Sequence, residues 1–241
     1  MEMIVMKKII CLFGIGLMGI SATKAQHISL GPEAGLNLYS ISERFDGSKE
    51  SNRLIPGFKI GGVVDFGLTR HFSIQPGMFF TTKGAVDKST DYTTVGATTT
   101  SVTTRDQLWL NYFEVPVNFL YKSNYSHTGR FFAGGGPYMA ALLGGKIKNE
   151  RTRTVSNDNG TTTNHTSNTY SVNIGNNPNT DDIRGGDVGI NMQCGYEFRS
   201  GLLLRYNLGL GIANVMPAGD ADNSMHNIGM SFTVGYLFRV H

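Results

Sequence analysis

The clearest pattern in the chain is a regular alternation of apolar and polar positions between residues 227 and 240. One set of alternate positions is wholly apolar and comprises Ile228, Met230, Phe232, Val234, Tyr236, Phe238 and Val240. The other set is small or polar, apart from Leu237. Successive side chains of a β-strand point to opposite sides. The segment is therefore predicted to be a strand with one apolar and one polar face.

The same alternation predicts seven further strands, at residues 28–38, 58–68, 72–83, 108–121, 130–146, 187–198 and 204–212. Most are close to the roughly 9–11 residues that a tilted membrane strand needs. The fifth is poorly phased, because three glycines and Pro137 interrupt it. The connections alternate between three short turns and four long polar stretches, at residues 39–56, 84–107, 147–183 and 213–225. Outer-membrane barrels typically have short turns at one rim and long loops at the other, whereas a soluble β-sandwich has no reason to separate its loops by length.

The first 25 residues have the three-part layout of a secretory signal peptide. Lys7 and Lys8 precede an apolar run over residues 9–20, and Ala25 is a small residue before Gln26. The run is shorter than the roughly 20 residues of a membrane-spanning helix, which disfavours an N-terminal anchor. We expect cleavage after Ala25, so that residues 1–25 are the signal peptide and residues 26–241 form one barrel domain.

Processing would also change the charge and the cysteine count. It would remove Lys7, Lys8, Lys24 and Glu2, lowering the formal net charge from +3 to +1. Such a balance gives no argument for a nucleic-acid partner. Cys194 would be the one cysteine left, so no intramolecular disulfide is possible. It falls on an apolar face and is expected to behave as a small hydrophobe.

These patterns together predict the fold class and the location. After residue 25 no apolar stretch approaches the length of a membrane-spanning helix, and lipid offers no hydrogen-bond partner to open backbone groups. We therefore predict an all-β fold, an eight-stranded antiparallel up-and-down transmembrane β-barrel with short periplasmic turns and long extracellular loops. Its place would be the outer membrane of a Gram-negative bacterium.

The polar face of each strand must point into the barrel, because an Arg or Lys facing lipid costs about 2–4 kcal/mol at mid-bilayer. The predicted interior charges are Glu33, Lys59, Asp65, Glu114, Asp187, Glu197, Arg205 and Arg239. We expect them to pair with one another, since an isolated buried charge is strongly unfavourable. An ion or proton path is the alternative, and it is less favoured because eight strands leave little open lumen.

Aromatic residues gather beside the short turns. They are Phe66, Phe72, Phe119, Tyr121, Phe131, Tyr196, Phe198, Tyr236 and Phe238. In a barrel they would form a girdle at the periplasmic membrane interface. Core aromatics of a soluble barrel are the alternative, and they would not need to collect at one rim.

Motifs for chemistry are weak. Residues 14–19 match a dinucleotide fingerprint but lie inside the signal peptide, without a strand-to-helix context. Residues 220–223 (DADN) could offer oxygens to calcium but lack the Gly turn and the bidentate Glu. The histidines show no metal-ligand spacing, and Gly-x-Ser-x-Gly is absent. We predict no catalytic, cofactor or metal site and no enzymatic activity, although an outer-membrane hydrolase stays open.

Two of the long loops are biased in composition. Residues 90–104 are rich in Thr, and residues 152–180 are rich in Thr and Asn. Such segments cannot bury a core, so they are predicted to be mobile or weakly strand-like extensions above the membrane. They could be adhesive or contact ligands, because loops on a rigid scaffold often carry function. A variable hydrophilic surface explains the composition equally well.

Four segments carry a resemblance to a known family: residues 31–37 (GPEAGLN), 72–77 (FSIQPG), 110–116 (LNYFEVP) and 195–198 (GYEF). With them, the mature chain resembles the PorT-like outer-membrane β-barrel proteins of Bacteroidetes. The resemblance implies the barrel fold and outer-membrane location, and it supplies no catalytic motif. The founding member serves a secretion system, but most members have no assigned role.

The end of the chain is similar to the C-terminal signal read by the barrel assembly machinery. The matching positions are Thr233, Gly235, Phe238 and Val240, and the chain departs from the pattern in having His241 after them. The expected partners are therefore outer-membrane lipid, the barrel assembly machinery, and envelope or secretion proteins. The leading function is a structural, surface-interaction or secretion-accessory role. A barrel that binds or transports lipids or small molecules comes second, and a lipid-modifying enzyme third.

Overall fold

The computed structural model describes residues 27–46, 48–158 and 160–240, so the predicted signal peptide lies outside the described residues. No helix in these ranges is long and apolar enough to cross a membrane. The described chain forms strands β1 (His27–Phe45), β2 (Ser48–Ser51), β3 (Ile55–Gly67), β4 (Phe72–Val95), β5 (Thr98–Lys122), β6 (Gly129–Asn157), β7 (Gly160–Ser171), β8 (Gly186–Phe198), β9 (Leu202–Gly211), β10 (Ser224–Tyr236) and β11 (Phe238–Val240).

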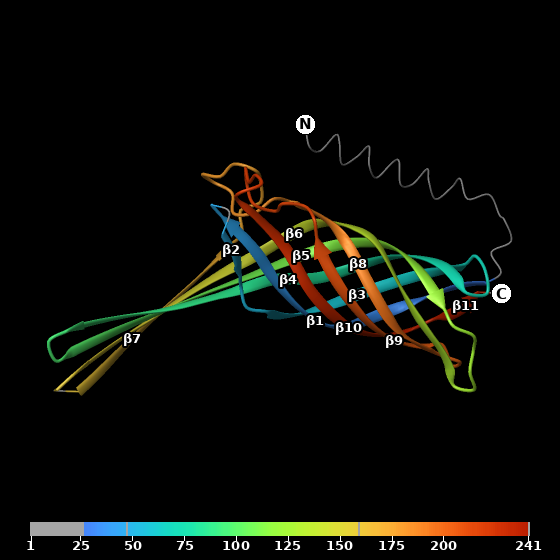
Figure 1. Cartoon of the computed structure of the whole chain (residues 1–241), viewed down its shortest axis with the longest axis horizontal. Helices are drawn as coiled ribbons and strands as arrows, with labels where there is room; N and C mark the ends of the chain where they lie inside the picture. Colours follow the sequence, from blue (N-terminus) through green and yellow to red (C-terminus); the bar gives the residue numbers. More distant parts are fainter. Residues whose placement is uncertain (1–26, 47, 159, 241) are drawn as a thin grey trace.

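Eight of these strands form a closed antiparallel ring (Figure 1). The order around the ring is β1, β3, β4, β5, β6, β8, β9 and β10, and β10 pairs back onto β1. At this seam Glu33 lies opposite Gly235, and β11 continues the pairing as far as Ile28 opposite Val240. β2 and β7 attach to β1 and β6 outside the ring. The predicted eight-stranded up-and-down barrel is confirmed.

The distribution of side chains is inverted relative to a soluble protein. On β10, Phe232 and Val234 are 58% and 53% exposed, whereas the alternate residues Ser231 and Thr233 are buried. Cys194 is likewise exposed on the outer surface. Every strand of the ring presents large apolar side chains outward, for example Leu36, Ile60, Met78, Phe119, Phe131, Met192, Leu204 and Phe232. In water such a surface would be strongly unfavourable, so lipid must cover it.

Exposed aromatic rings surround the end of the barrel that carries the short turns. Phe131 packs edge-on against Tyr196 with ring centroids 4.8 Å apart, and Tyr196 packs on Phe198 at 4.9 Å. Phe72 contacts Tyr121 across the neighbouring strands in the same way. Rings collected at one rim suit the boundary between lipid and water.

Two buried apolar clusters fill the ends of the barrel interior. The cluster nearer the short turns includes Phe79, Phe132 and Leu237, the last being the apolar exception on the polar face of the C-terminal strand. The other lies at the opposite mouth and comprises Ile41, Ala85, Leu110, Tyr112, Tyr138, Ala140, Leu142, Val172, Ile183 and Val215. The interior is thus closed by side chains at both ends.

Inward glycines make room for the large interior rings. A Cβ at Gly189 would lie 2.6 Å from the Tyr138 ring, and one at Gly229 would lie 2.5 Å from the Tyr39 ring. Both distances are too short for real carbon contacts, so neither ring could keep its position beside a larger residue. Glycine at these positions is therefore a packing requirement.

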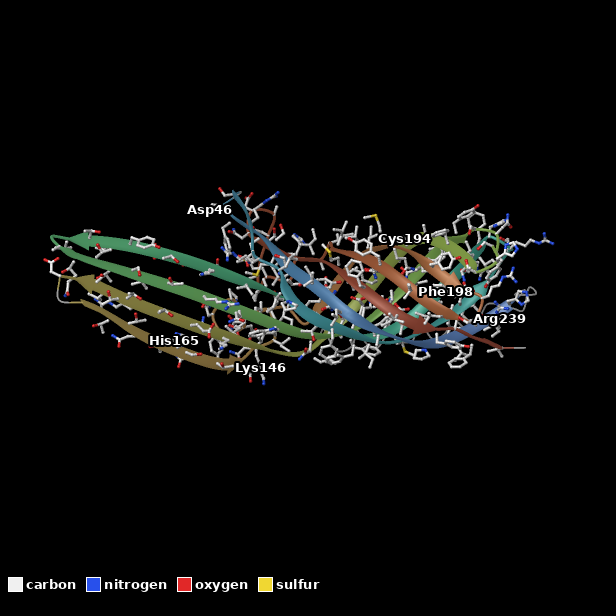
Figure 2. All side chains as sticks on the ribbon, turned by 90° about the horizontal axis from the view of Figure 1, so that it is seen from below. Asp46, Lys146, His165, Cys194, Phe198 and Arg239 are labelled. Atoms are coloured by element: carbon white, nitrogen blue, oxygen red, sulfur yellow. The ribbon has the colours of Figure 1, made fainter. Side chains whose placement is uncertain are left out.

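Three strands continue far beyond the barrel. β4, β5 and β6 contain 24, 25 and 29 residues, and β7 pairs with β6 along its whole length. Residues 86–95, 98–107, 148–157 and 160–171 thereby form a four-stranded antiparallel sheet, which we name the extension sheet (Figures 1 and 2). The sequence placed mobile or weakly strand-like segments here, and the structure has regular strands instead.

Candidate functional site

The barrel interior holds its charges in three groups at different depths. Nearest the extension sheet, the Lys83 ammonium lies 3.0 Å from both the Glu114 and the Asp187 carboxylates. Lys59 donates to the other oxygen of Glu114 at 2.9 Å. The Tyr138 hydroxyl donates to Asp187 at 3.1 Å, and its ring lies 4.3 Å from the Lys83 nitrogen. Every charge in this group has an opposite charge in contact.

The middle group is centred on Arg205. Its guanidinium lies 3.2 Å from the Glu33 carboxylate and donates to the side-chain carbonyls of Gln75 and Gln193, at 2.6 and 2.7 Å. The Thr233 hydroxyl donates to the other oxygen of Glu33. These contacts join side chains from five strands of the ring, so they tie opposite walls of the barrel together.

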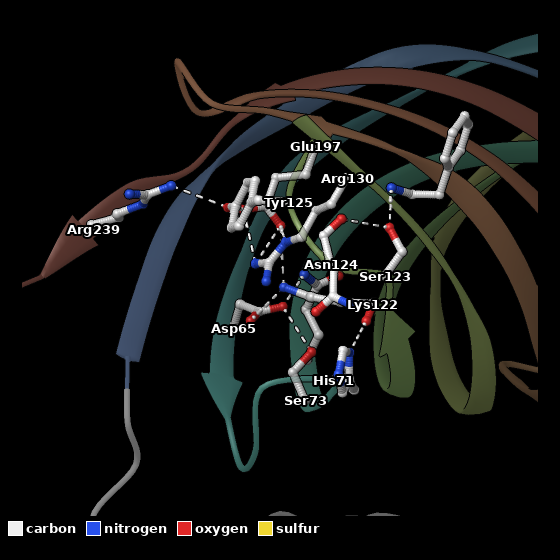
Figure 3. A network of polar contacts seen from close by, with 12 residues as sticks. Asp65, His71, Ser73, Lys122, Ser123, Asn124, Tyr125, Arg130, Glu197 and Arg239 are labelled. Carbon is white, nitrogen blue, oxygen red and sulfur yellow. Dashed lines mark hydrogen bonds and ion pairs between the residues drawn. The ribbon is translucent and has the colours of Figure 1, made fainter. Parts of the chain in front are cut away.

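The third group lies at the short-turn rim (Figure 3). Lys122 lies 2.8 Å from Asp65 and 3.3 Å from Glu197, and Arg130 donates to both oxygens of Glu197. Tyr125, in the turn between β5 and β6, donates its hydroxyl to the same carboxylate. Burial of the phenol and its bond to Glu197 raise the pKa of Tyr125. The group closes the rim with alternating charges.

Seven of the eight charges predicted for the interior are buried there. Two ion pairs form between members of the predicted set, Lys59 with Glu114 and Arg205 with Glu33. The remaining three are Asp65, Asp187 and Glu197, and all three pair with cations outside the predicted set.

Arg239 was wrongly placed among the interior charges. It lies exposed on β11, and its guanidinium donates to the Tyr125 hydroxyl at 3.1 Å. The reason is local, because β10 ends at Tyr236 and Leu237 interrupts the strand. β11 instead pairs with residues 28–30 at the short-turn end of β1, and its side chains are exposed there.

The missed cations are Lys83, Lys122 and Arg130. Each lies at or next to the end of a predicted strand, where the apolar alternation fades. In the structure, β4 continues beyond Lys83, β5 includes Lys122 and β6 includes Arg130. A count of charge would have exposed the omission, because the predicted set held five acids and three bases, including the misplaced Arg239. Charge balance along the inward face is thus a signal that the hydrophobic pattern alone does not give.

The four residues of the proposed assembly signal lie along the closing seam. Thr233 is buried against Glu33, Gly235 lies opposite Glu33 on β1, and Phe238 and Val240 are exposed on β11. Their recognition by the assembly machinery stays a prediction.

The central interior leaves little space. A cavity of about 10 Å³ lies beside Arg205 and Lys59, which is roughly the room that one water molecule needs. Its remaining lining is Glu33, Phe79, Pro116, Asn118, Asn191, Gln193, Asn207 and Ser231. Around Arg205, the interior of the described barrel is therefore tightly packed.

The outer part of one face of the extension sheet is covered with hydroxyl groups. The strand register places three successive rows of four residues there, which we name the hydroxyl face: Thr94, Thr99, Ser156 and Thr161; Tyr92, Ser101, Thr154 and Thr163; Thr90, Thr103, Thr152 and His165. Hydrogen bonds join neighbours within the rows, as between Thr90 and Thr103 at 3.1 Å and Thr154 and Thr163 at 3.2 Å. These rows contain eleven hydroxyl side chains and no carboxylate or ammonium group.

The other face of the extension sheet carries charged residues. Asp91, Arg151 and Arg153 point to it, and nearer the barrel it carries a shallow depression of about 480 Å³. The depression is lined by Thr104, Asp106, Asn149, Glu150, Arg151, Thr166 and Asn168. Asp106 there accepts a hydrogen bond from Asn149 at 2.6 Å. Toward the barrel, the row that follows the hydroxyl rows on their own face is charged as well, with Lys88, Arg105 and Glu150 beside Ser167. The neutral surface is therefore confined to the outer part of one face.

Comparison with protein families agrees with this architecture. Residues 24–216 match the outer membrane protein beta-barrel domain, which is well over half of the chain. The chain belongs to this family. It is therefore an outer-membrane β-barrel protein, and the end of the barrel with short turns faces the periplasm while the extension sheet projects outside the cell. No curated protein matches the chain by sequence.

Solved structures with a similar fold are distant. Ail, the attachment invasion locus protein of Yersinia pestis, is 11% identical, with 87% of this chain and 98% of that chain covered and a TM-score of 0.39. The outer membrane protease OmpT from Escherichia coli is also 11% identical, with 90% and 98% covered and a TM-score of 0.35. At such values the similarities carry no argument about function.

Proposed function

We propose that the protein is a non-enzymatic outer-membrane barrel that anchors the extension sheet and presents it as a contact surface outside the cell. The observation that carries the proposal is the extension sheet itself. Ordering each residue costs about 1–2 kcal/mol of backbone entropy, and among its apolar side chains this sheet buries only Val86 in return. Continuous strands from the barrel hold it in place, as a rigid scaffold holds a recognition loop.

The packed interior supports an anchoring role for the barrel. Its charges are engaged in ion pairs, and apolar clusters fill both ends. The alternative of a barrel that transports or binds small molecules would need an interior space far larger than about 10 Å³.

The same packing leads us to expect no stable channel. Purified protein in a planar lipid bilayer should give no sustained conductance above the bare membrane at moderate voltage. Large stable current steps would contradict a closed barrel and would favour the transport alternative.

The contact role can be tested with a shortened variant. Asp87 lies opposite Asp106, and Asn149 lies opposite Asn168, in one row across the sheet. Joining each pair through an Asn-Gly turn removes the outer part of the extension sheet and keeps every barrel strand. Cells displaying this variant should attach to immobilised polysaccharide, matrix protein or cells of their own kind several-fold less than cells with the full chain.

The comparison requires equal display of both proteins. The shortened barrel should retain its heat-dependent mobility shift on a gel, because the ring of eight strands closes without the outer sheet. Unchanged attachment to all three surfaces, with equal display, would reject the contact role.

A closer relationship to the PorT-like proteins and a secretion-accessory role remain sequence-based predictions. They would be supported if the gene lay among secretion-system genes, or if loss of the protein stopped export. Neither outcome depends on the extension sheet, so the shortened variant separates this role from surface contact.

A further inference from the structure

The two edges of the extension sheet are protected to different degrees. The outer edge formed by β4 carries Asp87, Lys88 and Asp91. The other edge is β7, whose twelve residues contain no proline, aspartate, glutamate, lysine or arginine, and are all exposed. Its register with β6 is continuous over the whole strand, without a bulge. Charges, prolines and bulges are the usual devices that prevent pairing at a sheet edge, and β7 has none of them.

The direction of the backbone groups on β7 follows from one hydrogen bond. Val172, just past the end of β7, donates its N–H to the Gly145 carbonyl opposite it. Antiparallel pairs alternate between bonded and non-bonded positions. The N–H and C=O groups of alternate residues therefore point away from β6, and these residues are Thr161, Thr163, His165, Ser167, Thr169 and Ser171.

All six of these outward-bonding residues also have side chains on the same side of the sheet, which includes the hydroxyl face. A strand that adds here must match both this row of backbone groups and the uncharged side chains of the edge. Another β7 provides both features. With Thr161 opposite Ser171, each outward residue faces an outward residue, and every side-chain pair across the junction on this side joins Thr, Ser or His.

We propose that β7 of a second copy of this chain adds to the β7 edge in antiparallel orientation, forming an eight-stranded sheet from two molecules. This inference deepens the proposed contact function by naming the partner, and it rests on that function. The two-fold axis would be perpendicular to the sheet, so the hydroxyl faces remain on the same side.

The orientation of the pair sets where the two barrels lie. Antiparallel pairing points the two extension sheets in opposite directions, which places the barrels at opposite ends and in two facing membranes. Copies in one membrane have the same direction, so a two-fold axis along the strands would pair their β7 strands in parallel and turn the two hydroxyl faces to opposite sides of the joint sheet. Parallel pairs are also slightly less stable than antiparallel pairs. The edge therefore favours contact between membranes.

One edge contact is small, but facing membranes carry many copies, so weak contacts add through avidity. The test uses vesicles that contain the purified full chain, with light scattering as the readout. Wild-type vesicles should aggregate. Thr163→Pro combined with Ser167→Pro removes two outward N–H groups and leaves the bonds to β6 intact, so vesicles with this variant should stay dispersed.

A matched control separates the backbone edge from the hydroxyl side chains. Thr163→Ala with Ser167→Ala keeps both N–H groups and should aggregate vesicles as the wild type does. Dispersed wild-type vesicles, aggregation of the proline variant, or dispersal of the alanine variant would each overturn the inference. The mobility shift on heating confirms that all barrels are folded.

Failure of this inference can be told apart from failure of the contact function. If wild-type vesicles stay dispersed while cells still lose attachment when the extension sheet is shortened, the sheet contacts another partner. If shortening has no effect on attachment either, both proposals are rejected.

Discussion

Lys83 shows how a fully buried cation is accommodated inside this barrel. Two carboxylates contact its ammonium, and the rings of Tyr39, Tyr112 and Tyr138 surround it within about 5 Å. Aromatic faces add favourable electrostatics to a desolvated cation. The site is a balanced group, in which removal of any one charge leaves another without compensation.

Substitution of Lys83 by Met should therefore be costly. It leaves Asp187 without its cation, and breaking a buried pair costs about 3–5 kcal/mol in free energy of unfolding. Lys88→Met changes an exposed lysine on the same strand and should cost less than about 0.5 kcal/mol. Reversible urea unfolding in detergent measures both, and similar stabilities for the two variants would contradict the buried-pair assignment.

A second comparison tests which exposed apolar residues meet lipid. Val234 on β10 and Val95 on β4 are 53% and 74% exposed, but only Val234 belongs to the barrel wall. Val234→Arg should impair assembly by about 2–4 kcal/mol, because it places a charge against hydrocarbon. Val95→Arg should assemble normally, since its surroundings are water. Equal yields of heat-shifting protein would show that the barrel wall does not contact lipid.

At the level of elements, the sequence predicts the barrel strands well and the extension sheet poorly. A membrane-facing strand must alternate apolar with polar residues, so the pattern at β8 or β10 is easy to recognise. Strand β7 consists of polar residues on both faces, which leaves no apolar period to detect. Its strand conformation depends on pairing with β6. Such a tertiary contact cannot be predicted from the local sequence pattern of β7.

The regularity of the extension sheet can be tested with engineered disulfides in a Cys194→Ser background. Thr90 and Thr103 are directly opposite, with hydroxyls 3.1 Å apart. Thr90→Cys with Thr103→Cys should therefore form a disulfide readily. Thr90→Cys with Thr104→Cys should not, because Thr104 points to the other face. Mass spectrometry without reductant distinguishes them, and equal oxidation would indicate a mobile loop.

At the level of the whole molecule, the strands form two different structures along their length, a barrel and a sheet. Within the membrane they form an inverted barrel, with charges inside and apolar side chains outside. Beyond the membrane β4, β5 and β6 leave the ring and continue as a sheet that is open to water on both faces (Figure 2). The change occurs at the apolar cluster that closes the outer mouth, which includes Ala85 and Leu110.

The central claim is that this chain crosses the outer membrane and carries the extension sheet outside. Labelling of intact cells with a membrane-impermeant maleimide tests it directly, in a Cys194→Ser background. Thr163→Cys on β7 should be labelled at once, whereas Ser200→Cys in a short turn should react only after the outer membrane is permeabilised. Labelling of Ser200→Cys on intact cells, or protection of Thr163→Cys, would contradict the claim.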